Sequence, residues 1–564
     1  MSVPERELIR LVREAVARAG PELGVDLMPE PIEISRPRRS EHGDFATNVA
    51  LALAGPASRS PREVADVIVR YLPESELVAK VDVAGPGFIN FFVTHGWLYT
   101  VLQEILSEGD AYGRLETEDP GRVQVEFVST NPTGPLHVGH ARNAVVGDAL
   151  CRLLETAGYP VQREYYVNDA GSQALLFGAS VEARYLEHHG RPGQIPEGGY
   201  QGEYIKELAA TIAAEHGDAL LELPPDERPW RLAQEGMRIA LEGIRASLER
   251  FGIRFDEWFR ESWLRERGEV DQAVGILRDA GLAYEQDGAI WFRATRYGDE
   301  KDRVLIRANG EPTYFAADCA YLRAKFERGF DRLVYVWGAD HHGTVKRLRG
   351  AVEAFGFDPD TVEFILTQLV ALYRGGEPAR MSKRTGDLVT LDELLDEVGP
   401  DAARYTLLSR SVDSPLDFDI DLVKRHTLDN PVYYVQYAHA RIASLLRYAV
   451  EQGRVRGPFS PTAAAPLVHE TELDLLRSLA EFPEQVRVAA DLRAPYRLTK
   501  YTEDVAAAFH RFYTECRVVT EDEDLTQARL HVSEGTRQVI ANALGIIGVS
   551  APESMERLEE DEAS

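Results

Sequence analysis

Val123-Gln-Val-Glu-Phe-Val128 leads into Ser129-Thr-Asn-Pro-Thr-Gly-Pro-Leu-His-Val-Gly-His140, and the architecture of the chain can be read outward from this passage. Its first part alternates apolar and polar residues with the period of two that is typical of a β-strand. Residues 141–157 then have the pattern of a helix, and residues 161–167 that of a second strand. Strand, loop, helix and strand in this order predict a βαβ unit of a parallel sheet.

Two further strand candidates, residues 289–292 and 333–337, predict that this sheet continues along the chain. We therefore expect a doubly wound, Rossmann-like parallel sheet, in which ligands bind outside the carboxyl ends of the strands. The fold class predicted for the whole chain is multidomain α/β.

The segments on either side of this sheet predict two other domains. A helix signal after Asp44 and the apolar run 87–92 indicate an N-terminal α+β domain over residues 1–118. The catalytic parallel-sheet domain would cover residues 119–424, with a charged helical insertion at about 180–265.

Strand signals stop after this domain, so a C-terminal all-α bundle is predicted over residues 425–564. One helix of the bundle carries an apolar stripe at steps of three and four, which favours core packing: Leu498, Tyr501, Val505, Phe509 and Phe512.

Composition narrows the class of protein further. The chain has 564 residues and a net charge of −29, which excludes a single small fold and argues against a non-specific nucleic-acid coat. Its three cysteines are too few for a disulfide framework or a four-cysteine zinc site. Acidic residues near the N-terminus and the lack of a long apolar run predict a cytoplasmic protein with no membrane span.

His137 and His140 are three residues apart where the predicted helix begins, so both can face one ligand. A helix N-terminus attracts phosphate, and two imidazole N–H groups can stabilise charge that develops on it. Gly139 would let a flat base lie against the backbone. The alternative interpretation makes the two histidines a helix cap and a surface residue.

A second basic segment, Arg380-Met-Ser-Lys-Arg-Thr-Gly-Asp387, follows the glycine pair 375–376. Lys383 and Arg384 could pair with the β- and γ-phosphates as pyrophosphate leaves. Taken alone, the segment could equally be a solvated basic loop.

The two segments together resemble a known class of enzyme. HVGH at 137–140 and RMSKR at 380–384 resemble the HIGH and KMSKS signatures of class I aminoacyl-tRNA synthetases. The run Glu126-Phe-Val-Ser-Thr-Asn-Pro-Thr-Gly-Pro-Leu-His-Val-Gly-His-Ala-Arg-Asn143 is similar to arginyl-tRNA synthetases in particular. The resemblance extends over nearly the whole chain, through residues 42–48, 166–173, 337–343, 497–501 and 507–513.

The resemblance implies an N-terminal tRNA-binding domain, a C-terminal anticodon-binding domain and a set of site residues. Catalysis would use His137, His140, Lys383 and Arg384, and ATP would be bound by Gly139, Gly338, Asp340, His341, His342, Met381 and Ser382. Arginine would be bound by Asn131, Glu261, Tyr314 and Asp318, and tRNA by Arg497, Lys500 and Tyr501. No metal ligand from the protein is implied, because Mg²⁺ is carried with ATP. Two positions depart from KMSKS: Arg380 replaces its first lysine and Arg384 its final serine.

Charge supports an arginine substrate, because a guanidinium is held best by carboxylates. Tyr314 and Asp318 share a face of a predicted helix, and no Lys or Arg three or four residues away neutralises Asp318. An ordinary surface carboxylate is the alternative there. Glu261 could simply form a helical ion pair with Arg265, in which case Glu257 would be the second carboxylate.

These observations predict ATP-dependent ligation of L-arginine to its tRNA through an arginyl-adenylate. The resemblance further implies a monomer and an activation step that depends on bound tRNA. Three alternatives remain open. They are another class I synthetase, a non-catalytic tRNA-binding relative, and a small-molecule adenylyltransferase, which would need neither flanking domain.

Overall fold

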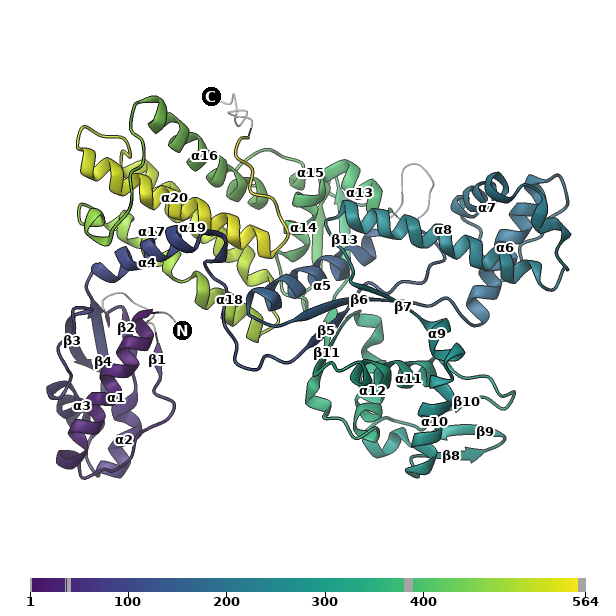
Figure 1. Cartoon of the computed structure of the whole chain (residues 1–564), viewed down its shortest axis with the longest axis horizontal. Coiled ribbons are helices and arrows are strands. Elements are labelled where there is room, and N and C mark those ends of the chain that lie inside the picture. Colours follow the sequence, from purple (N-terminus) through teal and green to yellow (C-terminus); the bar gives the residue numbers. More distant parts are fainter. Residues whose placement is uncertain (1–2, 36, 38–41, 380–388, 556–564) are drawn as a thin grey trace.

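The computed structural model describes residues 3–35, 37, 42–379 and 389–555. At its centre is a five-stranded sheet in the order β12-β11-β5-β6-β7, and every neighbouring pair is parallel. The strands are β5 (Val123–Glu126), β6 (Val161–Val167), β7 (Glu257–Arg260), β11 (Arg332–Gly338) and β12 (Val362–Thr367). This sheet and the helices around it confirm the predicted doubly wound fold (Figure 1).

The passage from which the fold was predicted forms the middle of this sheet. All four residues of β5 are buried, and helix α5 (Val138–Thr156) follows it. Helix α5 is buried on most of its surface, because the C-terminal bundle covers the side that faces away from the sheet. Because α5 follows β5 in the chain, its N-terminus lies at the carboxyl edge of the sheet, where ligands bind in this kind of fold.

Residues 289–292 form a strand, but not in the parallel sheet, so that part of the prediction was wrong. They are β9 (Ala289–Phe292), the middle strand of an antiparallel sheet with β8 (Ala283–Gln286) and β10 (Arg303–Ile306). The reason is the two-residue turn Asp287-Gly288, in which both residues have positive φ (52° and 75°). Such a turn closes a hairpin, whereas parallel neighbours need a long crossover.

Helices are inserted between β6 and β7, and others follow β7. The insertion comprises α6 (Ser172–His188), α7 (Glu203–His216) and α8 (Arg228–Arg250), which enclose a core of their own that includes Phe177, Ile205 and Leu232. A second separate core lies among α9 (Glu261–Glu266), α10 (Glu269–Asp279), α11 (Tyr314–Glu327) and α12 (His342–Ala354). A small sheet, β14-β13-β15, and helices α13 to α15 complete this part of the chain: β13 (Val370–Arg374), β14 (Glu377–Pro378), α13 (Leu391–Val398), α14 (Pro400–Leu408), β15 (Leu416–Asp419) and α15 (Ile420–Val423).

The N-terminal domain is the α+β unit that was predicted. Its antiparallel sheet has the order β1-β2-β4-β3, and the bounds of its elements are α1 (Val3–Leu23), β1 (Ile34–Ser35), β2 (Phe45–Thr47), α2 (Val49–Ala57), α3 (Pro61–Arg70), β3 (Val78–Ala84) and β4 (Phe88–Val93). Helix α4 (Gly96–Glu108) leaves this domain and packs against the C-terminal bundle (Figure 1). There the Tyr99 hydroxyl donates to the Leu467 carbonyl at 2.8 Å.

The C-terminal part is all-helical, as predicted. It comprises α16 (Pro431–Glu451), α17 (Glu470–Ala480), α18 (Phe482–Asp491), α19 (Tyr496–Glu515) and α20 (Glu523–Ile546). The five residues of the apolar stripe on α19 are all buried.

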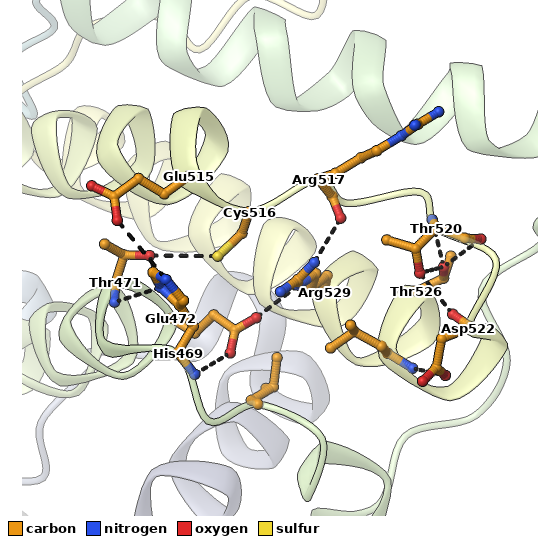
Figure 2. A network of polar contacts seen from close by, with 12 residues as sticks. His469, Thr471, Glu472, Glu515, Cys516, Arg517, Thr520, Asp522, Thr526 and Arg529 are labelled. Atoms are coloured by element: carbon orange, nitrogen blue, oxygen red, sulfur yellow. Dashed lines mark hydrogen bonds and ion pairs between the residues drawn. The ribbon is translucent and has the colours of Figure 1, made fainter.

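A polar network joins α17 to α20 inside this bundle (Figure 2). Glu472 is fully buried, and its carboxylate accepts from the Arg529 Nε at 2.7 Å and from the His469 backbone N–H at 2.9 Å. Arg529 also donates to the Arg517 carbonyl at 2.8 Å, which fixes the turn between α19 and α20. A buried carboxylate is costly unless it is paired in this way, so the network fixes how the helices meet.

Candidate active site

A large cleft opens at the carboxyl edge of the parallel sheet, where the fold predicts ligand binding. Its volume is about 2270 Å³. It is lined by the ends of β5, β6 and β11, the N-terminus of α5, one face of α11 and the helical insertion. A volume of this size exceeds the range of about 300–1,000 Å³ that is usual for a single small ligand.

His137 and His140 line this cleft and lie against each other, with ring centroids 3.7 Å apart. His137 is the N-cap of α5: its Nδ1 accepts from the Gly139 backbone N–H at 3.1 Å. His140 Nδ1 accepts from the His137 backbone N–H at 3.4 Å. Both rings therefore cap the helix, and because capping uses only one nitrogen of each ring, the other nitrogen is left for a ligand.

This arrangement determines which protons the two rings can offer. A neutral imidazole whose Nδ1 accepts a hydrogen bond carries its proton on Nε2. Burial lowers the pKa of His137, and burial together with its neighbour His137 lowers the pKa of His140 to about 3. Both rings are thus neutral at pH 7, and each keeps one Nε2–H donor for a ligand in the cleft.

Gly139 is required by the closeness of these rings. A Cβ at this position would lie 2.7 Å from His137 Cε1 and 2.8 Å from His137 Nδ1. Any larger residue would push the imidazole out of its capping position.

The loop after β11 supplies other residues of the predicted nucleotide site. Gly338, Asp340 and His341 line the cleft, and Asp340 and His341 are exposed. His342 begins α12 and is exposed, but it is not among the residues that line the cleft.

Three of the four predicted arginine-binding residues line the same cleft. Tyr314 and Asp318 both lie on α11, and Asn131 lies in the loop after β5, where its Nδ2 donates to Gln173 Oε1 at 2.9 Å. Asp318 forms no hydrogen bond or ion pair with any described residue. Burial and the carboxylates of Glu126 and Glu261 raise its pKa to about 7.

Glu261 lies behind the wall of the cleft rather than on its surface. It is 1% exposed, and it accepts from Arg265 at 2.9 Å, which is the helical ion pair that the sequence suggested. Glu257 is at the other end of β7, where it pairs in register with Glu164. The charge of Glu261 therefore raises the pKa of Asp318, whereas the charge of Glu257 raises the pKa of Arg328.

The sequence reasoning missed a group of buried charges below Asp318. The Lys325 Nζ, which is fully buried, donates to Glu126 Oε2 at 2.5 Å, and Glu126 lines the cleft. Lys325 lies seven residues after Asp318, two turns along the same face of α11. The available signal was Lys325 itself, which lies seven residues after Asp318 and so on the same face of the predicted helix.

The basic segment 380–384, with Lys383, Arg384, Met381 and Ser382, lies outside the described residues. The chain is described again from Val389, and there it is joined to the histidine signature. The Val138 N–H donates to the Val389 carbonyl at 3.0 Å, and the Leu391 N–H donates to the Leu136 carbonyl at 2.8 Å. His137 and Thr390 form an isolated antiparallel bridge.

The three residues predicted to contact tRNA lie on α19, away from the cleft. Tyr501 is 6% exposed and donates to the Ser478 carbonyl at 2.9 Å, so it belongs to the bundle core and its assignment as a tRNA contact is corrected. Lys500 is exposed and pairs with Asp504 at 2.8 Å, while Arg497 is half-buried.

The fold and site together define a class I aminoacyl-tRNA synthetase, and three segments match known families. Residues 101–413 match the family of class I (R) tRNA synthetase catalytic domains, residues 6–93 the arginyl-tRNA synthetase N-terminal domain, and residues 435–555 the DALR anticodon-binding domain. The chain belongs to the arginyl-tRNA synthetase family.

Two relatives match this chain nearly end to end. The arginine–tRNA ligase of Carboxydothermus hydrogenoformans is 49% identical, with 97% of this chain and 98% of the relative covered. That of Desulforudis audaxviator is 50% identical at the same coverage. A crystal structure of an arginyl-tRNA synthetase from Campylobacter jejuni has a TM-score of 0.75 at 33% identity, covering 82% of this chain and all of that one.

Among the described helices, none combines the length and the apolar character needed to cross a membrane.

Proposed function

We infer that this chain is an ATP-dependent arginine–tRNA ligase that works through an arginyl-adenylate. Membership of the family and full-length similarity to arginine–tRNA ligases support this function over the other class I synthetases. The chain uses ATP, as class I synthetases do.

The observation that carries the chemistry is the pair of Nε2–H donors at the carboxyl edge of the sheet. In the proposed reaction, the carboxylate of arginine attacks the α-phosphorus of ATP in line, and pyrophosphate leaves. His137 and His140 donate to the phosphate oxygens as negative charge grows on them. The groups around this point are hydrogen-bond donors, which suit phosphate, so we propose that Mg²⁺ arrives with ATP and neutralises its charge when bound.

We propose that Lys383 and Arg384, with Met381 and Ser382, act on the β- and γ-phosphates. The backbone pairing of residues 389–391 with 136–138 supports this role, because it ties the chain that follows the basic segment directly to His137. A Lys and an Arg brought to this point would stabilise the departing pyrophosphate.

The amino-acid end of the cleft is assigned to arginine. Asp318 is the proposed primary partner of the guanidinium, because its carboxylate has no partner among the described residues. We propose that Glu261 adds negative charge from behind the cleft wall. We also propose that Tyr314 packs beside the arginine side chain and that Asn131 contacts the α-amino end of the substrate. Gly139, Gly338, Asp340 and His341 are proposed to hold the nucleotide, and His342 is a weaker candidate because it does not line the cleft.

The two flanking domains are proposed to bind tRNA, with the anticodon end on the DALR domain. Of the surface residues considered on α19, Arg497 and Lys500 remain proposed contacts. We further propose that the protein works as a monomer in the cytoplasm, with domains at about 1–118, 119–424 and 425–564.

Charging of total tRNA with each amino acid in turn, together with ATP–pyrophosphate exchange with and without tRNA, tests this function. We expect charging with arginine alone, and exchange only when tRNA is present. Charging with another amino acid would contradict the arginine pocket, and no charging at all would favour a non-catalytic tRNA-binding protein.

A further inference from the structure

Four carboxylates lie in or behind the wall of the proposed guanidinium site, and three of them are paired with basic side chains. Glu261 pairs with Arg265 at 2.9 Å, Glu126 with Lys325 at 2.5 Å, and Glu164 with Arg328 at 2.6 and 2.8 Å. Asp318 is the carboxylate of this group for which the described residues offer no ion pair. The three pairs are neutral, so Asp318 is the carboxylate of this group that is left to meet a guanidinium. Arg347 also lines the cleft and lowers the pKa of Asp318, but the two form no ion pair among the described residues.

The Lys325–Glu126 pair is built deep in the protein. Lys325 is fully buried, and its Nζ lies 3.8 Å from the ring centroid of Tyr335 and 4.2 Å from that of Tyr321. The aromatic faces and the Glu126 carboxylate thus share its charge. The pair is neutral overall whichever group holds the proton, so it adds no net charge below the cleft.

Its partner Glu126 is the member of the pair that reaches the cleft. Glu126 ends β5 and lines the cleft together with Asp318 and Tyr166. Its neighbour Glu164 accepts from Arg328 and from the Tyr321 hydroxyl at 2.5 Å, whereas the hydrogen bond of the Lys325 Nζ goes to Glu126. Lys325 is consequently the group that offsets Glu126.

We propose that Lys325 is a positioning residue for arginine recognition, which acts by neutralising Glu126 so that Asp318 is the carboxylate of this group left without an ion pair. This inference rests on the proposed assignment of Asp318 to the guanidinium. The pocket then admits one positive charge, and Asp318 can ionise near neutral pH to receive it.

The electrostatics of Asp318 agree with this arrangement. Burial is the largest cause of its raised pKa, the carboxylates of Glu126 and Glu261 raise it further, and Arg347 and Lys325 lower it. The charged and titratable groups that face it from the surrounding elements are Glu126 (β5), Tyr166 (β6), Glu261 (α9), Lys325 (α11), Tyr335 (β11) and Arg347 (α12). Without Lys325, the uncompensated Glu126 would hold Asp318 in its neutral form to higher pH.

The test is the pH dependence of kcat/KM for arginine in tRNA-dependent pyrophosphate exchange, which reports ionisations of the free enzyme. Lys325→Met should move the acidic inflection up by about one pH unit and lower kcat/KM at pH 7 by about fivefold, with recovery at higher pH. Glu126→Gln leaves the ammonium unpaired and should move the inflection down. The double variant restores the charge balance and should return the inflection to its wild-type position.

Lys301→Met is the matched control, because Lys301 is exposed in the connection between β9 and β10 and does not line the cleft. Its inflection should not move, and the ATP KM of every folded variant should stay close to wild type. The proposal is overturned if Lys325→Met leaves the inflection in place, or if the double variant behaves like Glu126→Gln. The comparison of the double variant with Glu126→Gln tests the proposal even if Lys325→Met alone fails to fold. Asp318→Asn should remove the inflection; if it does not, the proposed arginine site itself fails.

Discussion

Gly139 shows at the scale of one residue how the helix cap serves the site. Gly139→Ala would place a Cβ within 2.8 Å of the His137 ring, so the ring must leave its cap and its Nε2–H must turn away. We expect kcat for pyrophosphate exchange to fall about 10- to 100-fold, with a smaller change in melting temperature. A variant that keeps wild-type kcat would show that the capped geometry is not the working one.

His140 should act as a neutral donor over the whole working pH range, because its pKa is lowered to about 3. His140→Asn, which retains an N–H donor, should lose less activity than His140→Ala, for which we expect a loss of about 10²- to 10³-fold in kcat. Parallel losses in the two variants would indicate that His140 does not act through hydrogen-bond donation.

Asp318 carries a stability cost in the absence of substrate. Its folded-state pKa of about 7 exceeds its ordinary value of 3.8, so the folded protein binds more protons than the unfolded chain between these values. This carboxyl therefore disfavours folding progressively as pH rises from about 4 to 7. Asp318→Asn should raise the melting temperature at pH 8 and change it little at pH 4, in scans without arginine; the opposite order would contradict the assignment.

Some of these residues were predictable from the sequence and others were not. Tyr314 and Asp318 are four residues apart on one helix, so their shared face follows from helical periodicity alone. Lys325 and Glu126 are separated by 199 residues, and only the packing of α11 against the sheet brings them together. Tyr501 was mistaken for a surface contact although its apolar stripe already favoured the core.

At the scale of elements, the junction of α17 with α20 depends on a buried charge pair (Figure 2). Glu472→Gln would leave Arg529 uncompensated, and we expect the bundle to lose about 2–4 kcal/mol of stability. Glu484→Gln is the matched control, because Glu484 pairs with Arg487 on one exposed helix face, where such pairs contribute about 0–1 kcal/mol. Urea unfolding followed by the fluorescence of a probe on the bundle gives both values; equal losses would contradict the account.

The elements themselves were largely predictable where their signal was local. The βαβ unit at 123–167 is continuous in sequence, so its local strand and helix periodicity was enough to predict it. The partner strands of residues 289–292 depend on the Asp287-Gly288 turn, whose hairpin signal the sequence reasoning did not use.

At the scale of the whole molecule, the apolar cores differ in how many domains they connect. One apolar core runs through the N-terminal domain, the parallel sheet and the bundle, whereas α6, α7 and α8 enclose a separate one. Leu232→Ala, in that separate core, should speed amide exchange in α6 to α8 while leaving α17 and α20 protected. Faster exchange throughout the chain would show that the insertion is coupled to the rest.

The central claim is that the cleft at the carboxyl edge of the sheet binds arginine through Asp318. The most direct test is the arginine KM of Asp318→Asn measured beside its ATP KM, in pyrophosphate exchange with tRNA present. We predict an arginine KM raised by about 100-fold or more, with an ATP KM close to wild type, because the guanidinium loses the carboxylate proposed as its primary partner. An unchanged arginine KM in a folded, active variant would contradict the claim.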